Sequence, residues 1–181
     1  MAPKVRVVIV DYNPEWPIRF ESERKRIMKA LEAPGLTVVH MGSTAVPGLG
    51  AKPIIDIMVG VRDRAEADRV QKALEKIGYT DVTPEPDDPE WFYCLGYGTR
   101  ELYHHVHLVV EGSRHWRRQL AFRDYLRAHP DIANEYHELK KRLAHHYGKN
   151  RNGYTEAKTE FITGVLKKVD GSALDEAEEK V

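Results

Sequence analysis

The stretch from His40 to Val61, HMGSTAVPGLGAKPIIDIMVGV, constrains the fold of this chain more than any other. It ends one apolar, β-branched run at residues 36–41, LTVVHM, and contains a second at residues 54–61, IIDIMVGV. Short runs of this kind are typical of buried strands, and the glycine and proline residues between them are typical of a loop. The sequence therefore predicts a strand, a loop and a second strand, and one acid, Asp56, interrupts the second strand.

Strand alternation gives the two faces of the second strand different surroundings. Ile55, Ile57 and Val59 share one face, whereas Asp56 and Met58 point to the other. An unpaired carboxylate in an apolar site is costly, so Asp56 needs a cation, hydrogen-bond donors or water beside it. A polar cleft or a metal would supply them. The alternative is an acid that caps a neighbouring helix or pairs with an arginine.

The loop between the strands has features of a phosphate-binding loop. Gly42 permits close approach of the backbone, Ser43 offers a hydroxyl and an N–H, and Pro-Gly at residues 47–48 suits a tight turn. Backbone N–H groups in such loops can hold phosphate oxygens, although many glycine-rich loops are plain turns. The loop is not a Walker A motif, because Lys52 is followed by Pro53 where serine or threonine would hold magnesium.

Hydrophobic periodicity and turn residues define the rest of the chain. Residues 5–10, VRVVIV, form either a first strand or an extended arm. The other predicted elements are a helix over 15–33, a helix over 63–77, a two-stranded hairpin over 91–110 that turns at GYGTR, two helices separated by Pro130, and a last helix over 155–169.

The length of 181 residues fits one domain. We expect that domain over residues 1–170, with a core at about 10–111 and helices at about 113–169, and a disordered acidic tail at 171–181.

Basic and acidic residues number 28 each, so no global field attracts nucleic acid or an anionic membrane. Cys94 is the single cysteine, and because the first residues contain only a short apolar run, we expect neither a signal peptide nor a membrane span there. The expected location is the cytoplasm.

Two histidines near the end of the hairpin could bind a metal. In YHHVHLVV, His105 and His107 alternate to one face, and His104 points to the other. The alternative is a pair of strand histidines that bond water and neighbouring carbonyl groups. His145 and His146 cannot easily share an ion, since adjacent helical residues diverge by about 100°, and they are expected at the surface.

Several words of the sequence resemble the GrpB family, also called UPF0157, whose members look like relatives of the nucleotidyltransferase superfamily. The words are HMGSTAVPGL, AKPIIDI, HHVHLV, FRDYLRAHP, YHELKKRLA and YTEAKTEFI. The resemblance covers nearly the whole chain from Val10 to Leu166. It implies an α/β (α+β) fold, namely a nucleotidyltransferase-like mixed β-sheet flanked by helices, with a C-terminal helical segment.

The resemblance also implies a site. In the superfamily a glycine-serine loop grips the triphosphate, which here corresponds to Gly42 and Ser43, with Thr44 next to them. Acids on neighbouring strands hold divalent metals, and Asp56 matches the first acid.

The match to the superfamily's acids is incomplete. Met58 stands where the second acid would be, and His107, with His105, is the candidate to replace the third. The metal would be Mg, Mn or Zn, and the imidazoles favour a transition ion over magnesium.

Four cations are expected near this pocket. Lys52, Lys158 and Arg123 lie in words shared with the family, and Arg100 is included for its position in the hairpin turn. Lys158 follows Tyr154 by four residues, so their side chains would share a helix face. The alternative for each cation is an ordinary solvated surface.

Together these features predict a metal-dependent nucleotidyltransferase with Asp56 and His107 as catalytic residues. It would bind a nucleoside triphosphate and transfer its nucleotidyl group to an unknown small acceptor. Two alternatives stay open: a non-catalytic module that binds a nucleotide or phosphometabolite, and a metal-dependent phosphohydrolase. A small molecule, in the first place a nucleotide, is the expected partner; a protein partner stays open, and neither a membrane nor nucleic acid is expected.

Overall fold

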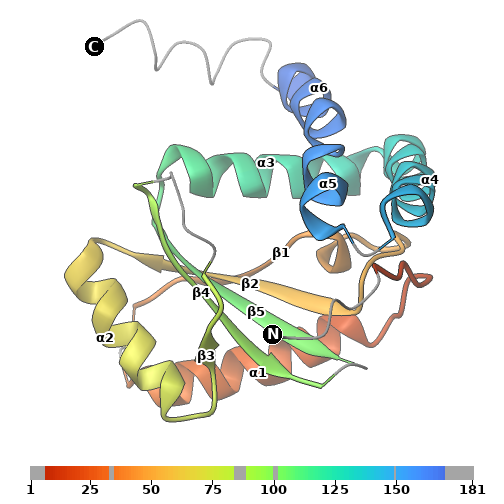
Figure 1. The fold of residues 1–181 in the computed structure, drawn as a ribbon. Coiled ribbons are helices and arrows are strands. Elements are labelled where there is room, and N and C mark those ends of the chain that lie inside the picture. Colours follow the sequence, from red (N-terminus) through yellow and green to blue (C-terminus); the bar gives the residue numbers. More distant parts are fainter. Residues whose placement is uncertain (1–6, 33–34, 84–88, 100–101, 149, 170–181) are drawn as a thin grey trace, which may run out of the picture.

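A computed structural model describes residues 7–32, 35–83, 89–99, 102–148 and 150–169 (Figure 1). Arg100 and the predicted tail at 171–181 lie outside these residues. The elements, in chain order, are α1 (Trp16–Leu31), β1 (Val38–Met41), a short 3-10 helix (Ser43–Ala45), β2 (Ile54–Val61), α2 (Arg64–Glu75), β3 (Thr80–Asp81), β4 (Trp91–Gly98), β5 (Tyr103–Val110), α3 (Arg114–Ala128), α4 (Pro130–Tyr147), α5 (Arg151–Glu156) and α6 (Thr159–Val169).

The five strands form one mixed sheet in the order β1-β2-β5-β4-β3. β2 lies between β1, to which it is antiparallel, and β5, to which it is parallel. β4 and β5 form the predicted hairpin. The mixed sheet with helices packed against it confirms the expected α+β fold class.

Helices cover both faces of the sheet (Figure 1). α1 and α2 lie on one face, where Ile55, Ile57 and Val59 of β2 join the largest apolar cluster. α3 to α6 lie over the other face. Asp56 points to that side, because it lines a cavity together with Phe122 of α3 and Tyr136 of α4. The predicted alternation along β2 is therefore confirmed, and it places an acid on the side of the C-terminal helices.

Two local features differ from the sequence predictions, and a third concerns a segment for which two alternatives were open. The last helix is interrupted between α5 and α6, so Lys158 lies at the break and not within one continuous helix. Residues 7–9 belong to no helix or strand, and Val10 forms an isolated bridge with Ala51, which agrees with the predicted arm and not with a first strand; residues 5–6 lie outside the described residues. β3 has two residues and is not among the predicted elements, because a strand this short has no alternation to read.

No helix in the described ranges is both long and apolar enough to span a bilayer.

The start of the loop after β1 brings the backbone against Asp56. Met41, the last residue of β1, pairs with Asp56, and the chain then turns at Gly42 with a φ of 72°. A β-carbon at Gly42 would lie 2.8 Å from Asp56 Oδ2. Only glycine meets both requirements, the left-handed φ and the missing side chain, so Gly42 sets how closely the loop approaches the carboxylate.

Gly42→Ala and Gly112→Ala form a matched pair that tests this close approach. Gly112 has a φ of 73°, and a β-carbon there would meet no described atom within 4 Å, whereas Gly42 has nearly the same φ beside Asp56. We expect Gly112→Ala to lower the free energy of unfolding by about 1–2 kcal/mol through backbone strain. Gly42→Ala should cost about 1–3 kcal/mol more through overpacking. Equal losses in urea denaturation would show that the contact with Asp56 is unimportant.

Candidate functional site

A cavity of about 1230 Å³ lies between the Asp56 face of the sheet and the C-terminal helices. Its lining includes Gly42 and Ser43 of the loop, Asp56 and His107 of the sheet, and Lys158 at the break between α5 and α6. Small-molecule sites usually measure about 300–1,000 Å³. The cavity is therefore large enough for a nucleotide together with a second small molecule.

Asp56 and His107 line one part of the cavity, and the Asp56 carboxylate lies between His107 and His105, which is absent from the described lining. Asp56 Oδ1 lies 3.4 Å from His105 Nδ1 and 3.5 Å from His107 Nε2. β2 and β5 bring them together, because Asp56 and His105 are register partners and His107 follows on the same face. Burial opposes ionisation of the carboxyl group, but the two imidazoles outweigh it and hold the pKa of Asp56 below its ordinary value. The structure thus unites the three residues predicted to bind a metal.

Another part of the cavity carries lysines. Lys140 of α4 is buried, and its Nζ donates to Ser43 Oγ at 2.9 Å and to the Gly50 carbonyl at 2.6 Å. Burial, with the nearby Lys158 and Lys52, lowers the pKa of Lys140 to about 7. The pKa of Lys158 falls to about 8, mainly through burial and also through Lys52.

Tyr154 organises two of these lysines. The Lys158 and Lys52 ammonium groups lie 4.7 and 5.7 Å from the centre of its ring. The predicted pairing of Lys158 with Tyr154 therefore forms even though the helix breaks between them. A ring face attracts both cations without neutralising either.

The positive charges of Lys140 and Lys158 are not paired with a carboxylate in the described part of the chain, where neither of them forms a salt bridge. Burial of an ammonium group without an ion-pair partner is costly, and this is the main reason why both pKa values are lowered; Lys158 is half-buried, and the nearby Asp56 offsets part of the effect there. A bound polyanion would relieve this cost, since it would favour the charged form of both lysines.

Lys140 is a charged cavity residue that the sequence predictions missed. It follows Tyr136 by four residues and precedes Ala144 by four, and all three are buried on the same face of α4. A lysine in the middle of an apolar helix stripe is a signal that could have identified it, because lysine is almost never fully buried without a partner.

Thr44 supports the loop from within. Its hydroxyl donates to the Ile54 carbonyl at 3.1 Å and lies 3.0 Å from His40 Nε2, so the histidine is the donor in that contact. Burial lowers the pKa of His40 to about 4, so its ring is neutral at physiological pH. Thr44 lines the cavity, but its hydroxyl is already committed to holding the loop on β2.

Arg123 is placed behind the loop and is absent from the described lining of the cavity. Its Nη1 donates to the His40 carbonyl at 2.8 Å, and its Nε pairs with Asp124. Arg127, one helical turn later in α3, donates to the Ala45 carbonyl at 2.9 Å. Both arginines hold the loop in position, and their hydrogen bonds direct them away from the expected phosphate site.

Met58, which stands where the sequence resemblance led us to expect the superfamily's second acid, is part of the apolar core. Its side chain is fully buried with Met41, Val109 and Trp116 in a cluster between the sheet and α3. An acid at this position would be surrounded by apolar groups, so the sheet offers one carboxylate here and not two.

Comparison with known proteins identifies the family. Residues 6–168 match the family model described as GrpB protein. A UPF0157 protein of Halalkalibacterium halodurans is 36% identical over 166 residues, which cover 92% of this chain and 84% of that protein. A UPF0157 protein of Pseudomonas aeruginosa is 39% identical over 164 residues, which cover 89% of this chain and 66% of that protein.

A solved structure agrees with these matches. The crystal structure of the conserved protein GrpB from Enterococcus faecalis has 36% sequence identity and a TM-score of 0.77, with 90% of this chain and 96% of that chain covered. The resemblance in the sequence words is thus confirmed across the sheet and the helices that form the cavity. The chain belongs to the GrpB family, also named UPF0157.

Proposed function

We propose that this protein binds a nucleoside triphosphate together with a divalent metal and transfers the nucleotidyl group to a small acceptor. One observation carries the proposal: in the described part of the chain, one cavity is lined by two lysines that form no salt bridge with a carboxylate and, apart from them, by Asp56 and His107, with His105 next to Asp56. The lysines suit a polyphosphate, and the carboxylate with its imidazoles suits a metal ion. A metal-bound triphosphate presents both charges in one ligand.

The loop and the lysines would bind the phosphates. Ser43 offers its backbone N–H and its hydroxyl, and the hydroxyl is already held by Lys140. Lys158 and Lys52, which lie over the Tyr154 ring, add positive charge. Electrostatic attraction in a partly desolvated site is stronger than in water, so these groups would give most of the affinity.

Asp56, His105 and His107 would hold the metal. Their oxygen and nitrogen atoms are suitable ligands for a divalent transition ion. When bound, such an ion polarises a phosphoryl oxygen and neutralises charge on the leaving group. In the transfer, an acceptor oxygen loses its proton and bonds to the α-phosphorus, and pyrophosphate leaves. The cavity continues past His107 to Trp91 and Arg118, where the acceptor has room.

Met58 favours a second candidate, a module that binds the nucleotide without turnover. The two-metal form of phosphoryl transfer needs enough ligands for two ions. With Met58 buried in an apolar cluster, the sheet supplies fewer carboxylates than that form requires. Tight nucleotide binding without transfer to any acceptor would support this candidate, and release of phosphate without an acceptor would indicate a phosphohydrolase.

Calorimetric titration tests the proposal. We expect the metal-stripped protein to bind ATP in the presence of manganese, zinc or magnesium, and Asp56→Asn to weaken this binding at least about 10-fold, as loss of a metal-site partner does. Asp131→Asn is the matched control, because Asp131 is exposed at the start of α4. If Asp56→Asn binds metal and ATP like the wild type, the proposed site is wrong.

Lowered lysine pKa values predict that polyphosphate binding takes up protons. At pH 8 the pKa values of about 7 for Lys140 and about 8 for Lys158 leave both partly neutral. A bound anion raises these pKa values, so protons are taken up and the affinity falls as the pH rises from 7 to 9. The binding enthalpy at pH 8 should therefore vary with the ionisation enthalpy of the buffer.

Lys140→Met provides the comparison for this experiment, because it removes one of the two titrating groups at similar length. The variant should take up fewer protons and bind ATP at least about 10-fold more weakly, since it lacks one buried charge opposite the phosphates. An enthalpy that is the same in all buffers for the wild type would contradict the role assigned to both lysines.

A further inference from the structure

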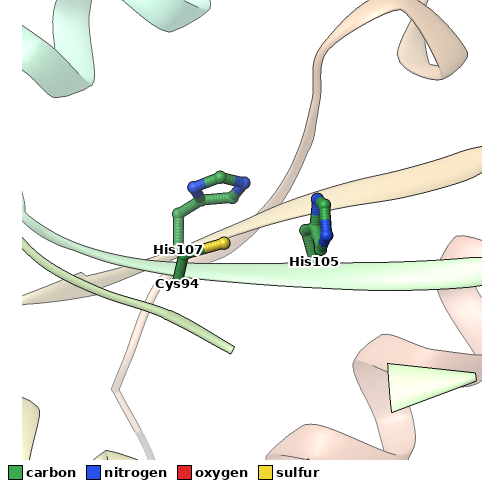
Figure 2. Close-up of side chains that lie close together, drawn as sticks. All are labelled: Cys94, His105 and His107. Carbon is green, nitrogen blue, oxygen red and sulfur yellow. The ribbon is translucent and has the colours of Figure 1, made fainter. Parts of the chain in front are cut away.

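Cys94 lies on the same face of the sheet as the two metal-site histidines. It is the register partner of His107 across β4 and β5, and its sulfur and one ring nitrogen from each of His105 and His107 lie within 4.8 Å of one another. Figure 2 shows the Cys94 sulfur beside the two imidazole rings. A thiol and two imidazoles, all from neighbouring strands, therefore meet next to Asp56.

The distances between these side-chain atoms are close to the distances between the ligand atoms of a bound metal ion. Bond lengths of about 2.0–2.3 Å in a tetrahedral zinc site put neighbouring ligand atoms about 3.4–3.6 Å apart. Asp56 Oδ1 already lies 3.4 Å from His105 Nδ1 and 3.5 Å from His107 Nε2. The Cys94 sulfur and one nitrogen of each imidazole lie within 4.8 Å of one another, so small side-chain movements would bring these three atoms to the separations of metal ligands.

Cys94 is buried, and two imidazoles lie beside it. The four apolar clusters formed by the described residues do not include it, although its side chain is almost fully buried. Its neighbours are instead the imidazoles and, within electrostatic range, Asp56. A cysteine that only fills space would sit more favourably among apolar side chains.

We propose that Cys94, His105 and His107, together with Asp56, form a thiolate–imidazole site that selects a zinc-class transition ion over magnesium. Magnesium prefers six oxygen ligands, whereas thiolate and imidazole suit zinc and its neighbours. The inference deepens the proposed function by naming the class of its metal, and it rests on that function for the role of the site. Metal binding itself can be measured without a nucleotide.

Binding involves one proton transfer at Cys94. The S–H bond breaks, the proton passes to the solvent, and the sulfur electron pair forms the bond to the metal, so no oxidant or reductant is needed. Without metal, burial and the nearby Asp56 raise the pKa of the thiol to about 12, and it stays protonated.

Cobalt(II) titration of the metal-free protein, in buffer without thiol reagents and without nucleotide, tests the site. Cys94 is the single cysteine of the chain, so any thiolate-to-cobalt charge-transfer absorption in a monomeric complex comes from this residue. We expect one cobalt per chain, this absorption band, and its loss when zinc is added. Cobalt that binds without the band, or no binding at all, would overturn the proposal.

Three variants sharpen the test. Cys94→Ser should abolish the band and lower zinc affinity about 100-fold or more, since loss of a ligand costs at least as much as loss of a supporting partner. Cys94→Val fills the same space with an apolar side chain that cannot bind a metal. If this variant retains wild-type zinc affinity, Cys94 is only a packing residue. His145→Ala/His146→Ala removes two exposed imidazoles at the end of α4 and should change nothing.

The metal test and the nucleotide test can fail separately. A thiolate–cobalt band in a protein that binds no ATP would support the metal site and contradict the proposed function. Metal-dependent ATP binding without the band would leave the proposed function in place and remove Cys94 from the site.

Discussion

The buried ammonium group of Lys140 connects the C-terminal helices to the glycine-serine loop that follows β1. It projects from α4 and donates to Ser43 Oγ and to the Gly50 carbonyl, at opposite ends of the glycine-serine loop. These two hydrogen bonds fix the loop against the C-terminal helices, but they do not neutralise the charge. The remaining desolvation cost appears as a pKa of about 7. An anion in the cavity would supply the missing charge, so ligand binding and the fixing of the loop depend on the same group.

On the sheet, the charge that needs a partner is negative, namely the Asp56 carboxylate. The isoleucines of β2 are buried under α1 and α2, and this fixes the register that turns Asp56 toward the C-terminal helices. The carboxylate stays ionised because His105 and His107 face it from β5. A ligand with positive and negative parts, such as a metal-bound polyphosphate, satisfies both requirements at once. Gly42 then limits what can stand between the loop and the carboxylate, since no side chain fits there.

Sequence reasoning works best where the pattern is local. Alternation in IIDIMVGV and HHVHLVV places Asp56, His105 and His107 on the correct faces, and the shared register of β2 and β5 brings them together. Helix boundaries agree within a few residues wherever proline or glycine marks them, as at Pro130. The break between α5 and α6 has no such marker, so the sequence predicts a single helix there.

Contacts between distant segments could not be predicted in the same way. Lys140 and Ser43 are 97 positions apart, and nothing in either local pattern indicates their hydrogen bond. Cys94 joins the histidines only through the pairing of β4 with β5. Arg123 shows the reverse: a cation in a family word binds the His40 carbonyl behind the loop, because α3 turns it away from the cavity.

A crystal structure with a non-hydrolysable nucleoside triphosphate and zinc would test the central claim most directly. The phosphates should lie on Ser43, Lys140 and Lys158, and the metal about 2.0–2.3 Å from its ligands at Asp56. A nucleotide bound elsewhere, with both lysines unchanged, would contradict this account.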